Sequence, residues 1–201
     1  ESSIMIAIAL YYLRQWFNRT TESAATDGAK ETATTATVKP KTAKDCPLST
    51  RQIMSLVQAS MDAKENAYAP YSNFRVGAAI LNSSGKIILG CNVENCAFGN
   101  TICAERSGLC SAVSQGIAYP PNSTSSSSSA VNGLHVVAIC VNTDLKDEFV
   151  YPCGTCRQSI REFGLDQWFI TCKPDKSYKI HHFTELLPYS FGPTSLTAQQ
   201  I

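Results

Sequence analysis

Helix-like and strand-like patterns alternate along the middle of this chain, from about residue 46 to residue 193. Apolar residues at helical spacing follow Ser49 and Thr50, either of which can cap a helix, and Pro70 disfavours helical backbone before it, so this helix should end near Tyr68. The other expected elements are strands at 74–81 and 86–93 joined by a turn at 82–85, a helix from 101 to 115, a strand buried on both faces at 134–141, a helix between Pro152 and Gly164, a strand at 168–172, an edge strand at 178–180 and a helical turn at 184–187. This order predicts a three-layer α/β domain with a mixed sheet.

Three segments do not fit this alternation of helix-like and strand-like patterns. Residues 4–13 form an apolar run that is too short to span a bilayer; it is either a short amphipathic helix or part of a signal or targeting sequence. Residues 20–44 are rich in Thr, Ala and Lys with few large apolar side chains, which is typical of a flexible linker. Residues 120–130 contain five consecutive serines and indicate a loop outside the core. We therefore expect an N-terminal segment and linker at 1–45, a folded domain at 46–193 and a tail at 194–201.

The charge balance restricts the partners of the chain. The 17 basic and 16 acidic residues give a formal net charge of +1, and no stretch is rich in Lys or Arg. A nucleic-acid binder normally carries such a stretch to neutralise phosphates, so neither a nucleic-acid partner nor a membrane partner is expected for the folded domain. The sequence favours a small-molecule substrate.

The nine cysteines point to a reducing compartment. Their odd number argues against a complete disulfide framework, and Cys140 and Cys172 lie inside apolar runs, which is typical of buried free thiols. Disulfides persist in oxidising compartments and are rare in the cytosol. We expect a cytoplasmic protein, with the targeting role of the N-terminal segment left open.

Three cysteines stand in a pattern typical of metal ligands. Cys103 opens a C-x-E motif, and fifty positions later a P-C-x-x-C motif contains Cys153 and Cys156. A structural zinc site closes its tetrahedron with four protein ligands, whereas a catalytic site supplies three and leaves one position for water. All three thiols lie near expected helix starts, where N–H groups and the helix dipole favour thiolates. The pattern predicts one Zn²⁺ per subunit with an open position.

Two charged residues follow the first of these cysteines. Glu105 is near the metal without having to ligate it, so its carboxylate can carry protons between water and a substrate as the catalytic general acid and base. Three thiolates on Zn²⁺ leave a formal charge of −1, and Arg106, one turn after Cys103, is expected to compensate it. The spacing C-x-E followed by P-C-x-x-C matches the Cys₃ variant of the zinc-deaminase signature.

At these motifs the chain resembles the small, homotetrameric cytidine deaminases, whose fold is a three-layer α/β/α sandwich around a five-stranded mixed sheet. The resemblance covers residues 46–193 and implies zinc-dependent hydrolysis of cytidine and deoxycytidine in pyrimidine salvage. It rests on five linked stretches: YSNFRVGAA at 71–79, NVEN at 92–95, CAER at 103–106, PCGTCRQ at 152–158 with REFG at 161–164, and LLP at 186–188 with FGP at 191–193.

The resemblance also implies roles in substrate binding. Asn92 and Glu94 would bind the ribose, with a buried Glu94 carboxylate reaching the 3′-hydroxyl. Such a carboxylate selects nucleosides, because it would be left unpaired without a sugar at a cost of about 1–3 kcal/mol.

The base would be held by four further contacts. Phe74 would pack against the pyrimidine, and Phe191 of a neighbouring subunit would help cover it. The backbone of Ala104 and the side chain of Glu105 would read the edge of the base. Two positions depart from the family: Phe98 replaces a usual tyrosine that reaches an adjoining site in the tetramer, and Arg75 replaces a frequent proline.

Three alternatives remain open at this point. A deaminase of polynucleotide cytosine would favour a His ligand at position 103, a basic groove and aromatic platforms, none of which is visible. A deaminase of another aminopyrimidine would dispense with Glu94. A non-catalytic, zinc-stabilised module would need a fourth protein ligand, for which Cys96 and Cys110 are candidates.

Overall fold

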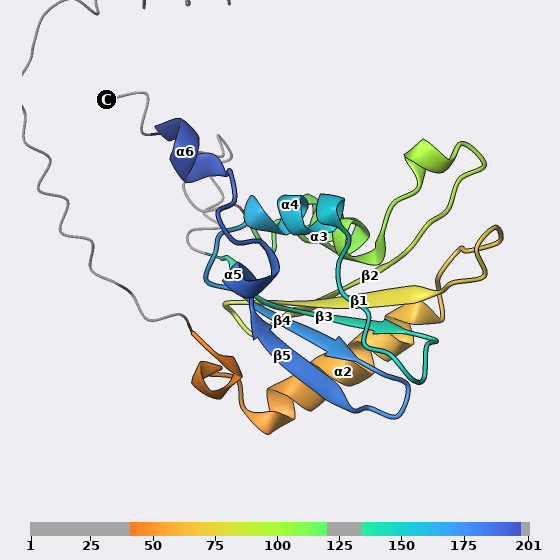
Figure 1. The fold of residues 1–201 in the computed structure, drawn as a ribbon, viewed down its shortest axis with the longest axis horizontal. Helices are drawn as coiled ribbons and strands as arrows, with labels where there is room; N and C mark the ends of the chain where they lie inside the picture. Colours follow the sequence, from red (N-terminus) through yellow and green to blue (C-terminus); the bar gives the residue numbers. More distant parts are fainter. Residues whose placement is uncertain (1–40, 120–133, 198–201) are drawn as a thin grey trace, which may run out of the picture. The chain divides into compact units, whose positions relative to one another are not determined.

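The structure is a computed structural model that describes residues 41–119 and 134–197. Its centre is a five-stranded sheet with the strand order β2-β1-β3-β4-β5 (Figure 1). Within this described part, β3 and β4 pair in parallel and the other neighbours are antiparallel, so the sheet is mixed as predicted. The strands are β1 (Val76–Asn82), β2 (Ile87–Cys91), β3 (Val136–Thr143), β4 (Trp168–Cys172) and β5 (Tyr178–His182).

Helix α2 (Thr50–Lys64) covers one face of the sheet (Figure 1). Ser49 is its N-cap, because its hydroxyl accepts a hydrogen bond from the backbone N–H of Gln52 at 3.3 Å. The helix ends at Lys64, before the predicted Tyr68, because Tyr68 instead donates its backbone N–H to the carbonyl oxygen of Asn92 at 3.0 Å. The apolar core on this face joins α2 to β1, β3 and β4 through Ile53, Leu56, Val57, Ala79, Leu81, Ala138, Cys140, Trp168, Ile170 and Cys172.

Three helices lie on the opposite face: α3 (Ala104–Ser114), α4 (Gly154–Arg161) and α5 (Phe183–Leu186). Their apolar side chains form a second core with the other face of β1, β3 and β4, including Ile80, Leu109, Ile139, Ile160, Phe169 and Phe183. Burying an aliphatic or aromatic side chain of this size contributes about 1.5–3 kcal/mol. The predicted three-layer α/β/α sandwich is confirmed.

The directions of the strands place the starts of α3 and α4 at the same end of the sheet, beyond the ends of β2 and β3. β1 is antiparallel to both of its neighbours, so β2 and β3 run in the same direction. α3 follows β2 and α4 follows β3, and both helices therefore start beyond the same ends of their strands. The two motifs with metal-ligand spacing lie at these helix starts.

Several boundaries differ from the sequence-based expectation. α3 begins at Ala104 because Cys103 has extended backbone and acts as the N-cap. A 3-10 turn, η1 (Ala43–Asp45), lies inside the expected linker, where the Thr42 N–H donates to the Asp45 carboxylate at 2.7 Å. A short helix, α6 (Pro193–Thr197), lies in the expected tail. The apolar run, most of the linker and the serine-rich loop lie outside the described residues.

Every helix within residues 41–119 and 134–197 is too short or too polar to cross a bilayer. All nine cysteines belong to these residues and are free thiols.

Candidate metal centre

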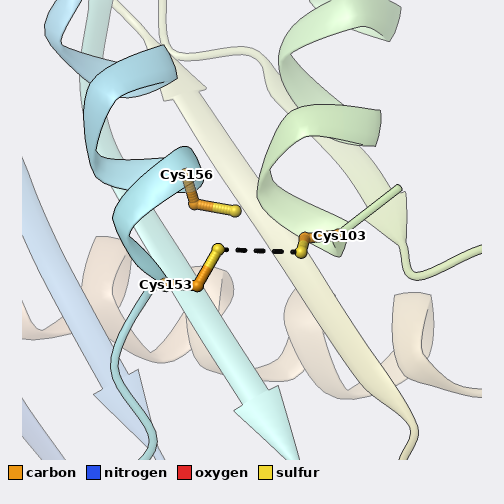
Figure 2. Close-up of side chains that lie close together, drawn as sticks. All are labelled: Cys103, Cys153 and Cys156. Carbon is orange, nitrogen blue, oxygen red and sulfur yellow. Dashed lines mark hydrogen bonds between the residues drawn. The ribbon is translucent and has the colours of Figure 1, made fainter. Parts of the chain in front are cut away.

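The three motif cysteines meet at the starts of two helices. Cys103 is the N-cap of α3, Cys153 is the N-cap of α4, and Cys156 lies in the first turn of α4. Figure 2 shows their side chains converging; the three Sγ atoms lie within 4.8 Å of one another, and Cys103 and Cys153 are 3.9 Å apart. Tetrahedral zinc with Zn–S bonds of about 2.3 Å holds two sulfurs about 3.8 Å apart. The spacing and chemistry of the sulfurs therefore fit a zinc ion.

The electrostatics of the cluster favour negative sulfur. The pKa of Cys103 is lowered to about 5, first by a hydrogen bond from the Cys156 thiol and then, against the effect of burial, by Cys153 and the charge of Arg106. The pKa of Cys156 is raised above its usual range by the same contact and by burial. The Cys103 sulfur is therefore favoured as a thiolate beside two further sulfurs, and a thiolate is a ligand type that zinc prefers.

No fourth side chain of the usual metal-ligand types joins this group within residues 41–119 and 134–197. Cys96 is exposed, and its Sγ lies 3.8 Å from the Asn95 side-chain oxygen. Cys110 is also exposed and lines a groove between α3 and α4. The geometry of the sulfurs is that of a three-ligand site.

Glu105 lies in the first turn of α3 beside the sulfurs. It is only 4% exposed, and burial raises the pKa of its carboxyl above the usual value, with the negative charge of Cys103 adding to this effect. The carboxyl accepts a hydrogen bond from the Cys156 thiol. A carboxyl whose pKa is raised by burial holds a proton more readily than an exposed one, which suits it to take up and release protons in catalysis.

Arg106 lies one position further along α3 and is half-buried. Its Nη2 donates to the backbone oxygen of Thr101 at 2.9 Å, and its charge acts on Cys103 and Cys156. Its Nε is buried with no hydrogen-bond partner in the described part of the chain. The guanidinium thus adds positive charge next to a negative cluster.

Asn92 and Glu94 lie close to Cys103 through backbone pairing. Between them, Val93 forms bridges to Tyr68 and to Ile102, the residue before Cys103. The amide of Asn92 is buried and binds backbone: its Oδ1 accepts from the Val76 N–H at 2.8 Å, and its Nδ2 donates to the Phe74 oxygen at 2.9 Å. If Asn92 binds a ribose, its amide can use only the donor and acceptor positions that these two bonds leave free.

The expectation of a buried Glu94 is wrong for the single chain, because the side chain is half-buried. Its carboxylate accepts from the Tyr71 N–H at 2.8 Å and the Ser72 N–H at 3.2 Å, and it also binds the Ser72 hydroxyl. These bonds, first that from the Ser72 hydroxyl, lower the pKa of Glu94. The sequence pattern did not single out the backbone N–H groups of Tyr71 and Ser72 as partners, since backbone donors carry no residue-type signal.

The remaining predicted residues differ in exposure. Ala104 is fully buried and Phe74 is half-buried. Phe98 is 74% exposed and its ring meets that of Tyr71 edge to face, with centroids 5.9 Å apart. Phe191 is 62% exposed, so within its own chain its ring is largely uncovered.

Comparisons with known proteins agree on one family. Residues 50–172 match the sequence pattern of the cytidine and deoxycytidylate deaminase zinc-binding region. A probable cytidine deaminase of Dictyostelium discoideum is 40% identical over 148 residues, which covers 74% of this chain and 89% of the relative. A cytidine deaminase of Mycobacterium tuberculosis H37Rv is 34% identical over 138 residues, 69% of this chain and 88% of the relative.

Solved structures give the same result. The crystal structure of cytidine deaminase from Burkholderia pseudomallei is 36% identical with a TM-score of 0.58, covering 69% of this chain and 98% of that chain. The crystal structure of the Mycobacterium tuberculosis enzyme is 30% identical with a TM-score of 0.53, covering 69% of this chain and 96% of that chain.

Proposed function

Because this chain belongs to the family defined by the cytidine and deoxycytidylate deaminase zinc-binding region, we propose that it hydrolyses cytidine and deoxycytidine to uridine and deoxyuridine. The reaction forms a C4–O bond with water, breaks the C4–N bond and releases ammonia. The observation that supports it best is the buried Glu105 carboxyl next to three converging sulfurs.

Cys103, Cys153 and Cys156 would hold the zinc ion. Zinc bound there supplies a Lewis acid that makes water a nucleophile at neutral pH. The raised pKa of Glu105 suits a carboxyl that moves two protons in turn: one from the attacking water to ring atom N3, which keeps it, and one from the new C4 hydroxyl to the leaving amino group. Arg106 would offset the formal −1 charge of a zinc ion with three thiolates.

The substrate residues are assigned by their positions in the family motifs. Phe74 would pack against the base, and the Ala104 backbone would bind its edge. Asn92 and Glu94 would bind the ribose. The Glu94 carboxylate suits this role, because its lowered pKa keeps it ionised at neutral pH, where it repels a nearby 5′-phosphate.

A homotetramer would complete the site with Phe191 from a neighbouring subunit. Large exposed apolar side chains support an interface, since monomers rarely expose contiguous apolar surface. An apolar groove of about 650 Å³ between α3 and α4, lined by Leu109, Val113 and Phe163 among others, offers a further surface for such contact. Light scattering should give a mass close to four times 21.8 kDa.

We place this activity in cytosolic pyrimidine salvage and assign it to the domain at 46–193, with residues 1–45 dispensable for the chemistry. Deletion of residues 1–45 tests this division, and a truncated chain without turnover would contradict it.

Loss of cytidine absorbance with the purified chain tests the function. We expect turnover of cytidine and deoxycytidine, inhibition by a zinc chelator, recovery on adding zinc, and little turnover of cytidine monophosphate. A zinc-loaded tetramer that leaves cytidine unchanged would contradict the proposal, and preferred turnover of the monophosphate would contradict the role of Glu94.

A further inference from the structure

A buried arginine at the end of α4 binds the segment that follows α5 and the first turn of α6. Arg161 is only 4% exposed. Its Nε donates to the hydroxyl of Ser190 at 3.0 Å, and its Nη2 donates to the hydroxyl of Thr194 at 3.1 Å. Among the ion pairs of the described residues, none includes Arg161. A buried guanidinium is costly unless its donors are satisfied, so these two hydroxyls are important partners.

The same guanidinium lies directly against Gly192. A Cβ atom added to Gly192 would stand 2.3 Å from Cζ of Arg161, a separation that side chains do not reach. One turn earlier on α4, Nε2 of Gln158 donates to the backbone oxygen of Phe191 at 3.2 Å. The last two turns of α4 therefore hold the backbone on both sides of Phe191.

The ring of Phe191 is exposed, whereas its backbone contacts α4. Although 62% of Phe191 is exposed, its backbone oxygen and its next neighbour are both held by α4. The ring is therefore available for an aromatic contact with another surface, while its backbone stays bonded to α4.

Resting on the proposed function and its tetramer, we infer that Arg161 is a positioning residue for catalysis in the neighbouring subunit. It holds Phe191 where the ring covers the base that is bound in the neighbouring subunit. The same helix has Cys153 as its N-cap and Cys156 in its first turn, so its start would hold the metal of its own subunit and its end would serve the substrate of another.

Kinetics of Arg161→Gln provide the first test. Loss of one well-placed aromatic contact, worth about 0.5–1.5 kcal/mol, should raise KM for cytidine about 2- to 10-fold with a smaller change in kcat and unchanged zinc content. The KM of Arg161→Lys should fall between those of the parent chain and of Arg161→Gln, because lysine reaches the hydroxyls but lacks the planar guanidinium. Arg51→Gln, an exposed arginine of α2, is the matched control.

A milder variant covers the case in which Arg161→Gln does not fold. Ser190→Ala removes one acceptor of the guanidinium from a half-buried position and should raise KM in the same direction by a smaller factor. Folded, zinc-loaded variants of both positions with the KM of the parent chain would overturn the inference.

A double-mutant cycle tests whether Arg161 acts through Phe191. In a Phe191→Ala background, Arg161→Gln should add no further increase in KM, because the ring it positions is gone. Additive increases in KM would show that Arg161 acts elsewhere and would overturn the inference.

Mixed tetramers test action between subunits. Subunits with Arg161→Gln keep Glu105, whereas subunits with Glu105→Gln keep a correctly held Phe191. Co-expressed and purified through two tags, mixed tetramers should show a higher kcat/KM per intact Glu105 than tetramers of Arg161→Gln alone. An unchanged value, or a monomeric chain, would overturn the inference, whereas a parent chain without cytidine turnover would instead contradict the proposed function.

Discussion

Replacement of Gly90 by alanine tests whether the contact between β2 and α3 sets the geometry of the metal site. A Cβ at Gly90 would stand 2.4 Å from the Ala104 oxygen and 2.4 Å from the Gly108 nitrogen, both backbone atoms of α3. Ordinary contact begins near 3.4 Å, so the helix and strand must separate by about 1 Å. Because Cys103 caps this helix, its sulfur should move away from the two sulfurs on α4.

The expected cost has two parts. Overpacking of this kind costs about 1–3 kcal/mol of unfolding free energy. Displacement of one ligand should lower zinc affinity about 10- to 100-fold, the range seen when groups that orient metal ligands are lost. Denaturant unfolding of the zinc-free chain measures the first quantity, and chelator competition measures the second.

Substitutions at two other glycines distinguish a loss of folding stability from a loss of zinc affinity. At Gly77 an added Cβ would meet the backbone of α2, 2.1 Å from the Ser60 oxygen, and α2 carries no proposed ligand. Gly77→Ala should therefore destabilise the fold comparably while zinc affinity stays near that of the parent chain. Gly99→Ala, with nothing within 4 Å of its Cβ, should change neither. Equal zinc affinity for Gly90→Ala and Gly77→Ala would refute the reasoning.

Three further variants test the chemistry, the charge network and the sugar contact. Glu105→Gln should keep zinc and fold but lower kcat about 10²- to 10⁴-fold in the absorbance assay; near-normal turnover would exclude the proton-transfer role. Asp144→Asn removes the partner of the buried Lys64 amine, 2.9 Å away, and should destabilise the chain at pH 7 by about 1–3 kcal/mol, at the low end because the carboxylate is partly solvated. Hydrogen bonding to Arg75 lowers the pKa of Asp144, so this difference in unfolding free energy should be full above pH 3.8 and vanish as the pH falls through the lower folded value; a difference that persists in acid would contradict this. Glu94→Ala should weaken binding of cytidine far more than that of free cytosine, and an equal loss for both ligands would remove its role at the sugar.

The three proposed metal ligands could be singled out from the sequence because each motif carries a local signal. A thiol near a helix start and a glutamate two positions later depend only on short spacing, and both cysteines that act as N-caps lie close to an expected helix start. Their convergence follows from the order of the strands, with β1 between β2 and β3, which is set by contacts far apart in the sequence.

Residues that act through backbone groups were not predictable in the same way. The bonds of Asn92 go to the backbone of residues near β1, and those of Glu94 include two backbone N–H groups. Arg161 gave no distinct signal, because an arginine in the last turn of a helix is usually solvated and favoured by the helix dipole. Its burial depends on where the segment after α5 returns to α4.

These backbone bonds connect the residue proposed to bind the base with one of the residues proposed to bind the sugar. Asn92 binds on both sides of Arg75, to the Phe74 oxygen and the Val76 N–H, so it fixes the residue proposed to hold the base. Asn92→Ala would therefore leave buried backbone groups unpaired and disturb the base contact even if the amide never touched a ribose. Glu94 lies at a half-buried position, and its loss exposes its backbone partners to water at a smaller structural cost. The sugar contact is for this reason assigned more directly by varying Glu94 than by varying Asn92.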